Sequence, residues 1–136
     1  MSENGRYLCK AKRVDNKKWI QGYLFEFWGK SHILWGMVND CPDMVEVDPS
    51  AICQCTGLRD KADKLIWEND VVTYTDELVN KVKIDKIGWN ETHAAFTRLH
   101  KSQMGLQYLY INEGIAKKCE VIGNIFDNPE LLERKE

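Results

Sequence analysis

The sequence predicts a mainly β protein, and three observations support that prediction. Segments rich in aromatic and β-branched residues recur along the chain, as in WIQGYLFEFW at 19–28 and HILWGMV at 32–38. Clusters of residues that favour turns separate these segments, as in DNKK at 15–18. Only the last ten residues carry a clear helix signal. The chain has 136 residues, which fits one domain.

The first third of the chain predicts two consecutive β-hairpins. Strands are expected at 6–13, 19–28 and 32–38, and the short link GKS at 29–31 joins the last two. NDCPDM at 39–44 is expected to form a loop, because Asn, Asp and Pro cluster there.

A short helical turn and a strand are expected next. Asp48 and Pro49 can begin a turn or one turn of helix, because proline fixes φ at the value that the first helical position needs. In the strand that follows, Cys53 and Cys55 share one face because side chains alternate along a strand.

The stretch TGLRDKADKLIWENDVVTY at 56–74 is the most patterned part of the chain. It predicts a turn at 60–63, a short strand at 65–67, a tight reversal at 68–70 and a new strand after it. Asn is the residue other than glycine that best accepts positive φ, so we expect positive φ at the centre of the reversal.

The acidic residues of this stretch have two interpretations. Asp60, Glu68 and Asp70 could form a metal or acid–base cluster, but no histidine at helical spacing accompanies them. Acidic side chains at turns usually accept hydrogen bonds from nearby backbone amides. We therefore assign these carboxylates to turn geometry.

The second half predicts four more elements. In KVKIDKIGW at 81–89 the apolar residues move from even to odd positions, which predicts a β-bulge near Asp85 and Lys86. NETHAAFTRLH at 90–100 fits either a capped helix or a hairpin turn with a returning strand. Strands are expected at 106–111 and 119–126.

A short C-terminal helix is expected in DNPELLERKE. Asn128 is a candidate N-cap, Pro129 fits the first helical position, and Glu130 lies near the positive end of the helix.

Composition indicates a soluble protein of the cytoplasm. No apolar run approaches the roughly 18 to 20 residues that span a membrane, and the polar N-terminus lacks the apolar core of a signal peptide. The five Cys are an odd number, which favours free thiols over a disulfide framework.

No motif predicts catalysis, a metal site or a cofactor. The three His lack ligand spacing, and Cys53 and Cys55 with Cys41 do not form the two well-spaced pairs of a zinc site. Neither a nucleophile elbow nor a phosphate loop is present. We therefore predict no enzyme activity and no cofactor, with no catalytic and no metal-binding residue.

One segment predicts nucleic-acid binding as an alternative function. KAKRVDNKKW at 10–19 forms a basic hairpin with an aromatic residue, which suits phosphate contact and base stacking. The candidate residues are Lys10, Lys12, Arg13, Lys17, Lys18 and Trp19. The net charge of the chain is −2, so this function would depend on local positive charge.

Several segments resemble the YopX-like family of phage and prophage proteins. That family typically reads Thr-Gly-Leu, Asp, Lys, often Asn-Gly, Lys, a hydrophobic pair, and then Glu-Gly-Asp before a β-branched strand. The matching positions are Thr56, Gly57, Leu58, Asp60, Lys64, Ile66, Glu68, Asp70 and Val72. KKWIQGY at 17–23 resembles the family's N-terminal hairpin, VDPSAICQCTGL at 47–58 resembles the approach to the signature, and EVIGNIFDNPELLE at 120–133 resembles its ending.

The resemblance refines the expected fold. The family has a strand where this chain has 94–100, which favours the hairpin there. Its Glu-Gly-Asp turn is similar to the turn that opens a strand in SH3-like barrels. We therefore expect a small, partly open antiparallel barrel, SH3-like, with N-terminal β-hairpins and a short C-terminal helix. The domain prediction is one domain over 1–136, with a hairpin region at 1–48 and a signature-bearing barrel region at 49–136.

The resemblance implies a phage- or prophage-type protein but assigns no activity to any residue. The predicted function is a non-catalytic protein-interaction module in the host cytoplasm, with no membrane contact. Its partner would be a host or phage protein, or a second copy of the chain in a homo-oligomer, because aromatic edge strands are common docking sites.

Overall fold

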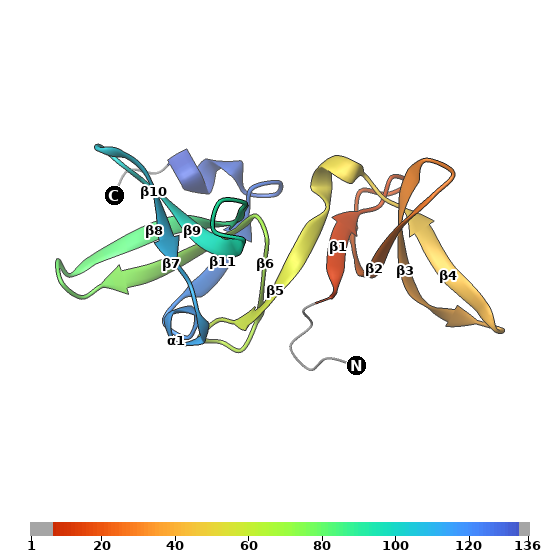
Figure 1. Cartoon of the computed structure of the whole chain (residues 1–136), viewed down its shortest axis with the longest axis horizontal. Coiled ribbons are helices and arrows are strands. Elements are labelled where there is room, and N and C mark those ends of the chain that lie inside the picture. The colour runs from red at the N-terminus through yellow and green to blue at the C-terminus, as the bar shows by residue number, and fades with distance from the viewer. Residues whose placement is uncertain (1–6, 134–136) are drawn as a thin grey trace. The chain divides into compact units, whose positions relative to one another are not determined.

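The computed structural model describes residues 7–133 and consists mainly of antiparallel strands (Figure 1). The prediction of a mainly β fold is confirmed. The sheets are not closed into a barrel, and the SH3-like arrangement stays a prediction. The chain divides into two compact units between Cys55 and Thr56, called here the N-terminal and C-terminal units. Whether the two units act as one domain also stays a prediction.

The N-terminal unit contains most of a sheet with strand order β4-β3-β2-β1-β5-β6, of which β6 (Leu65–Trp67) and the end of β5 belong to the C-terminal unit. Its elements are β1 (Cys9–Lys12), β2 (Trp19–Phe27), β3 (Lys30–Val38), β4 (Cys41–Glu46), the 3-10 helix η1 (Pro49–Ala51) and the start of β5 (Cys53–Arg59). The inner face of the sheet buries Ala11, Ile33 and Val47 as a small core. An isolated bridge between Arg13 and Val47 links the end of β1 to the chain after β4.

Strand β2 changes its partner halfway along its length. Residues 19–22 pair with β1, whereas residues 23–27 pair with β3. The change occurs at Gly22, which is buried against the carbonyl oxygen of Leu34. A Cβ at this position would overlap that oxygen, so the glycine permits the close backbone approach at the bend.

The two predicted N-terminal hairpins are confirmed, but the predicted loop at 39–44 is wrong. Asn39 and Asp40 both take positive φ, at 51° and 63°, and this tight turn lets β4 return along β3. The expected helical turn is present as η1, where Asp48 Oδ1 accepts a hydrogen bond from the Ser50 amide at 2.9 Å.

The C-terminal unit contains a second sheet, with strand order β10-β9-β8-β7-β11. Its elements, besides the end of β5, are β6 (Leu65–Trp67), β7 (Asp70–Asp76), β8 (Lys81–Asn90), β9 (Ala95–Ser102), β10 (Gly105–Tyr110), α1 (Glu113–Ala116), β11 (Glu120–Asn124) and the 3-10 helix η2 (Pro129–Glu133). The core is formed by Ile66, Val72, Ile87, Ile111, Ala116 and Cys119. None of the helices in the described part of the chain is long and apolar enough to cross a membrane.

The predicted hairpin at 90–100 and the strands on both sides of the 68–70 reversal are confirmed. The C-terminal helix forms as the 3-10 helix η2, and its candidate cap Asn128 instead accepts a hydrogen bond from the Asn124 amide at 3.3 Å. Helix α1 was not expected from the sequence. Its cap is Asn112, which accepts from the Ile115 amide at 2.9 Å.

The β-bulge predicted near Asp85 and Lys86 is wrong. Strand β8 pairs with β7 and with β9 in continuous register. Asp85 and Ile87, at odd positions in the middle of β8, are fully buried, whereas Lys81 and Trp89 at the odd positions near its ends are exposed. Val82 lies on the even side and is 58% exposed, so the strand exposes an apolar side chain rather than shifting its register.

Asn69 takes positive φ, at 72°, as the sequence predicts. Its amide donates to the Ile87 carbonyl at 2.8 Å, and its carbonyl accepts from the Ile125 amide at 3.1 Å. We predict that Asn69→Gly is tolerated or raises the free energy of unfolding by up to about 1 kcal/mol, because glycine has no steric cost at positive φ. Urea denaturation measures the change. Asn69→Ala is the control and should lower stability by about 1 kcal/mol, and equal effects of both substitutions would contradict the prediction.

Candidate functional site

The buried carboxylate Asp60 holds three backbone amides in the C-terminal unit. Its Oδ1 accepts hydrogen bonds from the amides of Ala62 and Lys64, and its Oδ2 accepts from the amide of Val121, all at 2.9 Å. The turn at 60–63 is completed by Asp63, whose φ is 64°. Asp60 thus closes its own turn and ties that turn to β11.

Asp70 and Thr56 have similar structural roles. Asp70 is buried, and its Oδ2 accepts from the Trp67 amide at 2.8 Å across the 68–70 reversal. The Thr56 hydroxyl donates to the Ile66 carbonyl at 2.7 Å and accepts from the Leu58 amide at 3.1 Å. The assignment to turn geometry is therefore confirmed for Asp60 and Asp70 by their contacts, and for Glu68 it stays a prediction.

The pKa of Asp60 is lowered from its ordinary value. Burial alone would raise this pKa and is the largest single influence, but the hydrogen bonds from Val121, Lys64 and Ala62 together outweigh it. Within residues 7–133, no group of three or more His, Cys, Asp and Glu side chains could hold a metal ion. What this carboxylate does chemically is to accept hydrogen bonds in its ionised form.

The structure brings three of the candidate nucleic-acid residues together on β1 and β2. The ammonium groups of Lys10 and Lys12 lie 4.8 Å and 5.4 Å from the centre of the Trp19 ring, as cation–π contacts. Lys12 pairs with Trp19 in the strand register, which places these side chains on one face of the sheet.

The other three candidates are separate from this group. The Arg13 guanidinium forms two hydrogen bonds with Asp15, at 2.9 Å and 2.7 Å, so its charge is already paired. This contact raises the pKa of Arg13 and lowers that of Asp15. Lys17 and Lys18 are exposed in the turn before β2, and Lys17 takes positive φ at 64°.

Sequence reasoning missed a row of aromatic side chains that continues from Trp19. Alternation along β2 places Trp19, Tyr23, Phe25 and Phe27 on one face of the strand, named here the β2 aromatic row. Phe25 stacks on His32 of β3 with ring centres 5.5 Å apart, and Phe27 meets the same ring edge-on at 5.9 Å. The odd numbering of these residues in WIQGYLFEF was the signal that could have identified the row.

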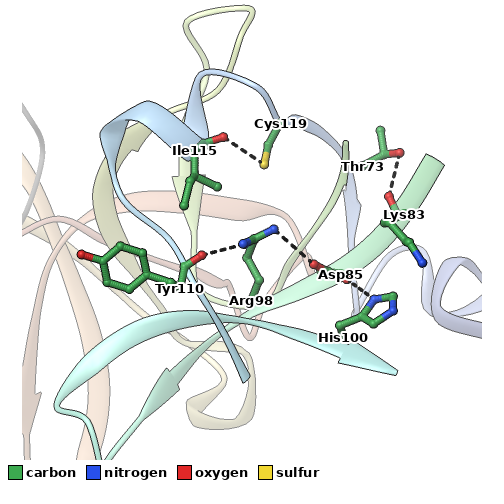
Figure 2. Close-up of polar contacts among 8 residues, drawn as sticks. All are labelled: Thr73, Lys83, Asp85, Arg98, His100, Tyr110, Ile115 and Cys119. Carbon is green, nitrogen blue, oxygen red and sulfur yellow. Dashed lines mark hydrogen bonds and ion pairs between the residues drawn. The ribbon is translucent and has the colours of Figure 1, made fainter. Parts of the chain in front are cut away.

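The C-terminal unit also contains a buried polar cluster that the sequence did not predict (Figure 2). Asp85 lies between Arg98 and His100, two residues of β9 that share a face. Its Oδ1 is 2.7 Å from His100 Nδ1, and its Oδ2 is 3.8 Å from the guanidinium of Arg98. Arg98 also donates to the Tyr110 carbonyl at 2.8 Å and lies 4.8 Å from the centre of the Tyr74 ring.

Burial dominates the protonation of this cluster. It raises the pKa of Asp85, and the contacts with His100, Tyr74 and Arg98 oppose that rise only in part. Burial also raises the pKa of Tyr74, with a smaller contribution from Asp85, and it raises the pKa of the Cys119 thiol. A protonated, buried thiol is a poor nucleophile, and the contacts of Asp85 with Arg98 and His100 join β8 to β9.

The acid stability of the protein should depend on Asp60. Because its folded-state pKa is lowered, its stabilisation is present above about pH 3.8 and is lost as pH falls through the folded value. We predict that Asp60→Asn lowers the free energy of unfolding by about 1.5–3 kcal/mol at neutral pH, and that the difference from wild type shrinks in acid. Denaturation at a series of pH values tests this. Asp63→Asn, at a side chain that is 77% exposed, is the control; a constant difference at all pH values would contradict the prediction.

Removing Asp85 should destabilise the fold strongly. We predict that Asp85→Ala lowers the free energy of unfolding by about 3–5 kcal/mol, because Arg98 and His100 lose their buried partner. The control is Glu46→Ala, which removes an exposed ion pair with Lys30 at 4.0 Å and should cost no more than about 1 kcal/mol. Urea denaturation of both variants gives the comparison, and losses of similar size would show that the cluster adds little.

Comparison with known proteins identifies the family of the chain. No curated protein matches the chain significantly. The family model described as YopX protein matches residues 10–133, which include all the strands of both units except the first residue of β1. The chain therefore belongs to the YopX family.

Proposed function

We propose that the protein is a non-catalytic protein-interaction module that docks its partner along the edge strand β10. The observation that carries this proposal is a row of exposed side chains on that strand. Leu106 and Tyr108 are each 59% exposed and Tyr110 is 71% exposed, and alternation places all three on one face. Tyrosine is enriched at protein interfaces because it combines apolar area with a polar tip.

Strand β10 lacks the features that usually protect the edge of a sheet. It pairs in regular register with β9 and contains no charged residue and no proline. The other edge strands described are protected: β4 contains a proline and two acidic residues, β6 has only three residues, and β11 has a bulge between Val121 and Gly123. An open edge of this kind offers unpaired backbone groups to a strand from another chain.

The partner that fits this edge best is a second copy of the chain. Two β10 strands can pair antiparallel about a two-fold axis, and a register centred on Tyr108 places each Leu106 opposite the partner's Tyr110. The uncharged strand meets its copy without repulsion between like charges. Arg98 fixes the end of β10 through the Tyr110 carbonyl, so the strand is already ordered for pairing.

A second candidate function, nucleic-acid binding, is favoured by a separate observation on the N-terminal unit. Lys10 and Lys12 both lie over the Trp19 ring, so two cations and an aromatic ring share one face. Phosphate contact and base stacking are the two elements of binding to single strands. We also propose that the protein comes from a phage or prophage and acts in the cytoplasm, as the resemblance implies. This applies whether its function is protein interaction or nucleic-acid binding.

Light scattering during size-exclusion chromatography tests the β10 interface. We predict that wild type shifts towards the mass of two chains as its concentration rises, and that Tyr108→Lys remains at the mass of one chain. The substituted lysine would face its own copy across the two-fold axis and would repel it. Met104→Lys is the matched control, because it adds the same charge in the adjacent turn, at a residue that is 95% exposed. A wild-type protein that stays monomeric at high concentration would contradict the self-pairing proposal.

A further inference from the structure

The β2 aromatic row lies on the outer face of the N-terminal sheet. The strand register pairs Ala11 with Ile20, and these two residues belong to the core and its surroundings on the inner face. The row, with Lys10 and Lys12, therefore lies on the opposite face. Tyr23 is 43% exposed and Phe27 is 46% exposed, so two rings of the row are available to a ligand.

Two rings of the row, those of Phe25 and Phe27, contact the His32 ring before any ligand binds. The face of Phe25 is covered by His32, which it meets at an angle of 26° between ring planes. The Phe27 ring meets His32 at 78° and Trp28 at 55° between ring planes, so neither of these rings is stacked parallel on it. Aromatic rings that are already ordered lose little conformational entropy when a second ring stacks on them.

The spacing of the exposed rings selects the conformation of a nucleic acid. Tyr23 and Phe27 are four residues apart on one strand, which corresponds to about 13 Å. Successive bases of one strand in a duplex are only about 3.4 Å apart and are covered by their neighbours. Bases that stack on both rings must therefore be separated from each other, as they are in an extended single strand.

The positive charges at one end of this face complement such a ligand, and at the other end the carboxylate of Glu46, on the same face, is paired with Lys30 at 4.0 Å. Lys10 and Lys12 place two positive charges beside the row, and the Trp19 ring holds both ammonium groups through cation–π contacts. Trp19 is thus a positioning residue for the lysines. Phosphates bound there lie at one end of the row, and the chain of the ligand can continue along β2 towards Phe27.

We propose that this outer face binds an extended single strand of nucleic acid, with phosphates at Lys10 and Lys12 and bases stacked on Tyr23 and Phe27. The inference rests on the second candidate function, nucleic-acid binding, and it narrows the ligand to single strands. It does not depend on pairing through β10, which lies in the other unit.

Fluorescence anisotropy with two labelled probes tests the proposal: an oligothymidylate of about 15 nucleotides and a duplex of the same length. We expect wild type to bind the single strand more tightly than the duplex. Tyr23→Ala and Phe27→Ala should each weaken binding by about 5-fold to 100-fold with no change in salt dependence. Phe27→Leu, which keeps apolar volume but removes the ring, should lose as much as Phe27→Ala.

Substitution of the lysines, unlike that of the aromatic residues, should change the salt dependence of binding. Replacing both Lys10 and Lys12 by Gln removes two phosphate contacts, so the slope of log affinity against log salt concentration should become shallower by about 1.4. Lys101→Gln is the control at an exposed lysine of the C-terminal unit, and it should leave affinity and slope unchanged. Circular dichroism and thermal denaturation of every variant confirm that each one folds.

Two results would overturn the proposal, and they are distinct. Failure to bind either probe at low salt would remove both nucleic-acid binding and the narrower inference. Equal binding of the duplex and the single strand, unaffected by Tyr23→Ala and Phe27→Ala, would leave nucleic-acid binding in place and would show that the aromatic row does not stack bases.

Discussion

The C-terminal unit depends on one carboxylate that receives three backbone hydrogen bonds. Asp60 binds two amides of its own turn and the Val121 amide, which is 61 residues further along the chain. A buried carboxylate that accepts this many hydrogen bonds is stable in its ionised form, because the donors replace the lost water. This side chain therefore joins the turn at 60–63 to β11, together with the backbone hydrogen bond from the Lys61 amide to the Cys119 carbonyl at 2.9 Å. Asp60 lies in the stretch 56–74, the most patterned part of the sequence, and this stretch forms the connection to β11.

A second buried carboxylate explains the irregular apolar pattern of β8. The change from even to odd apolar positions predicted a bulge, because a register shift is the usual way to keep apolar residues on one face. The chain instead keeps the register and buries Asp85 beside two residues of the neighbouring strand, with a hydrogen bond between Oδ1 and His100 and an ion pair between Oδ2 and Arg98 at 3.8 Å. A residue that is charged in the sequence can thus occupy a core position when its partners lie one strand away. The periodicity of one strand's sequence does not show which side chains the neighbouring strand will place beside it.

Several parts of the structure that local chemistry determines were predicted from the sequence, although the locally capped helix α1 was not. Asn69 and the turn at 60–63 follow from residues that accept positive φ or that bind backbone amides, and η1 follows from Asp48 and Pro49. The parts that depend on distant partners were not predicted. Strand β4 forms because β3 is available to pair with it, even though its sequence contains turn-forming residues. The aromatic contacts of Phe25 and Phe27 likewise depend on His32 from the next strand.

Contacts from the neighbouring strand distinguish aromatic residues that are packed from those that are available to a partner. Phe25 is half-buried because His32 covers it, and Trp89 has a similar contact with Phe96, at 5.2 Å between ring centres. Tyr108 and Tyr110 lie on an edge strand whose outer side no described strand covers. Burying apolar surface is favourable at roughly 25 cal/mol per Å², so a row of uncovered rings on an ordered strand retains a driving force for association. Two such surfaces lie on described strands, one beside lysines on β2 and one on the uncharged edge strand β10, and we propose that the difference in charge favours a different kind of partner for each.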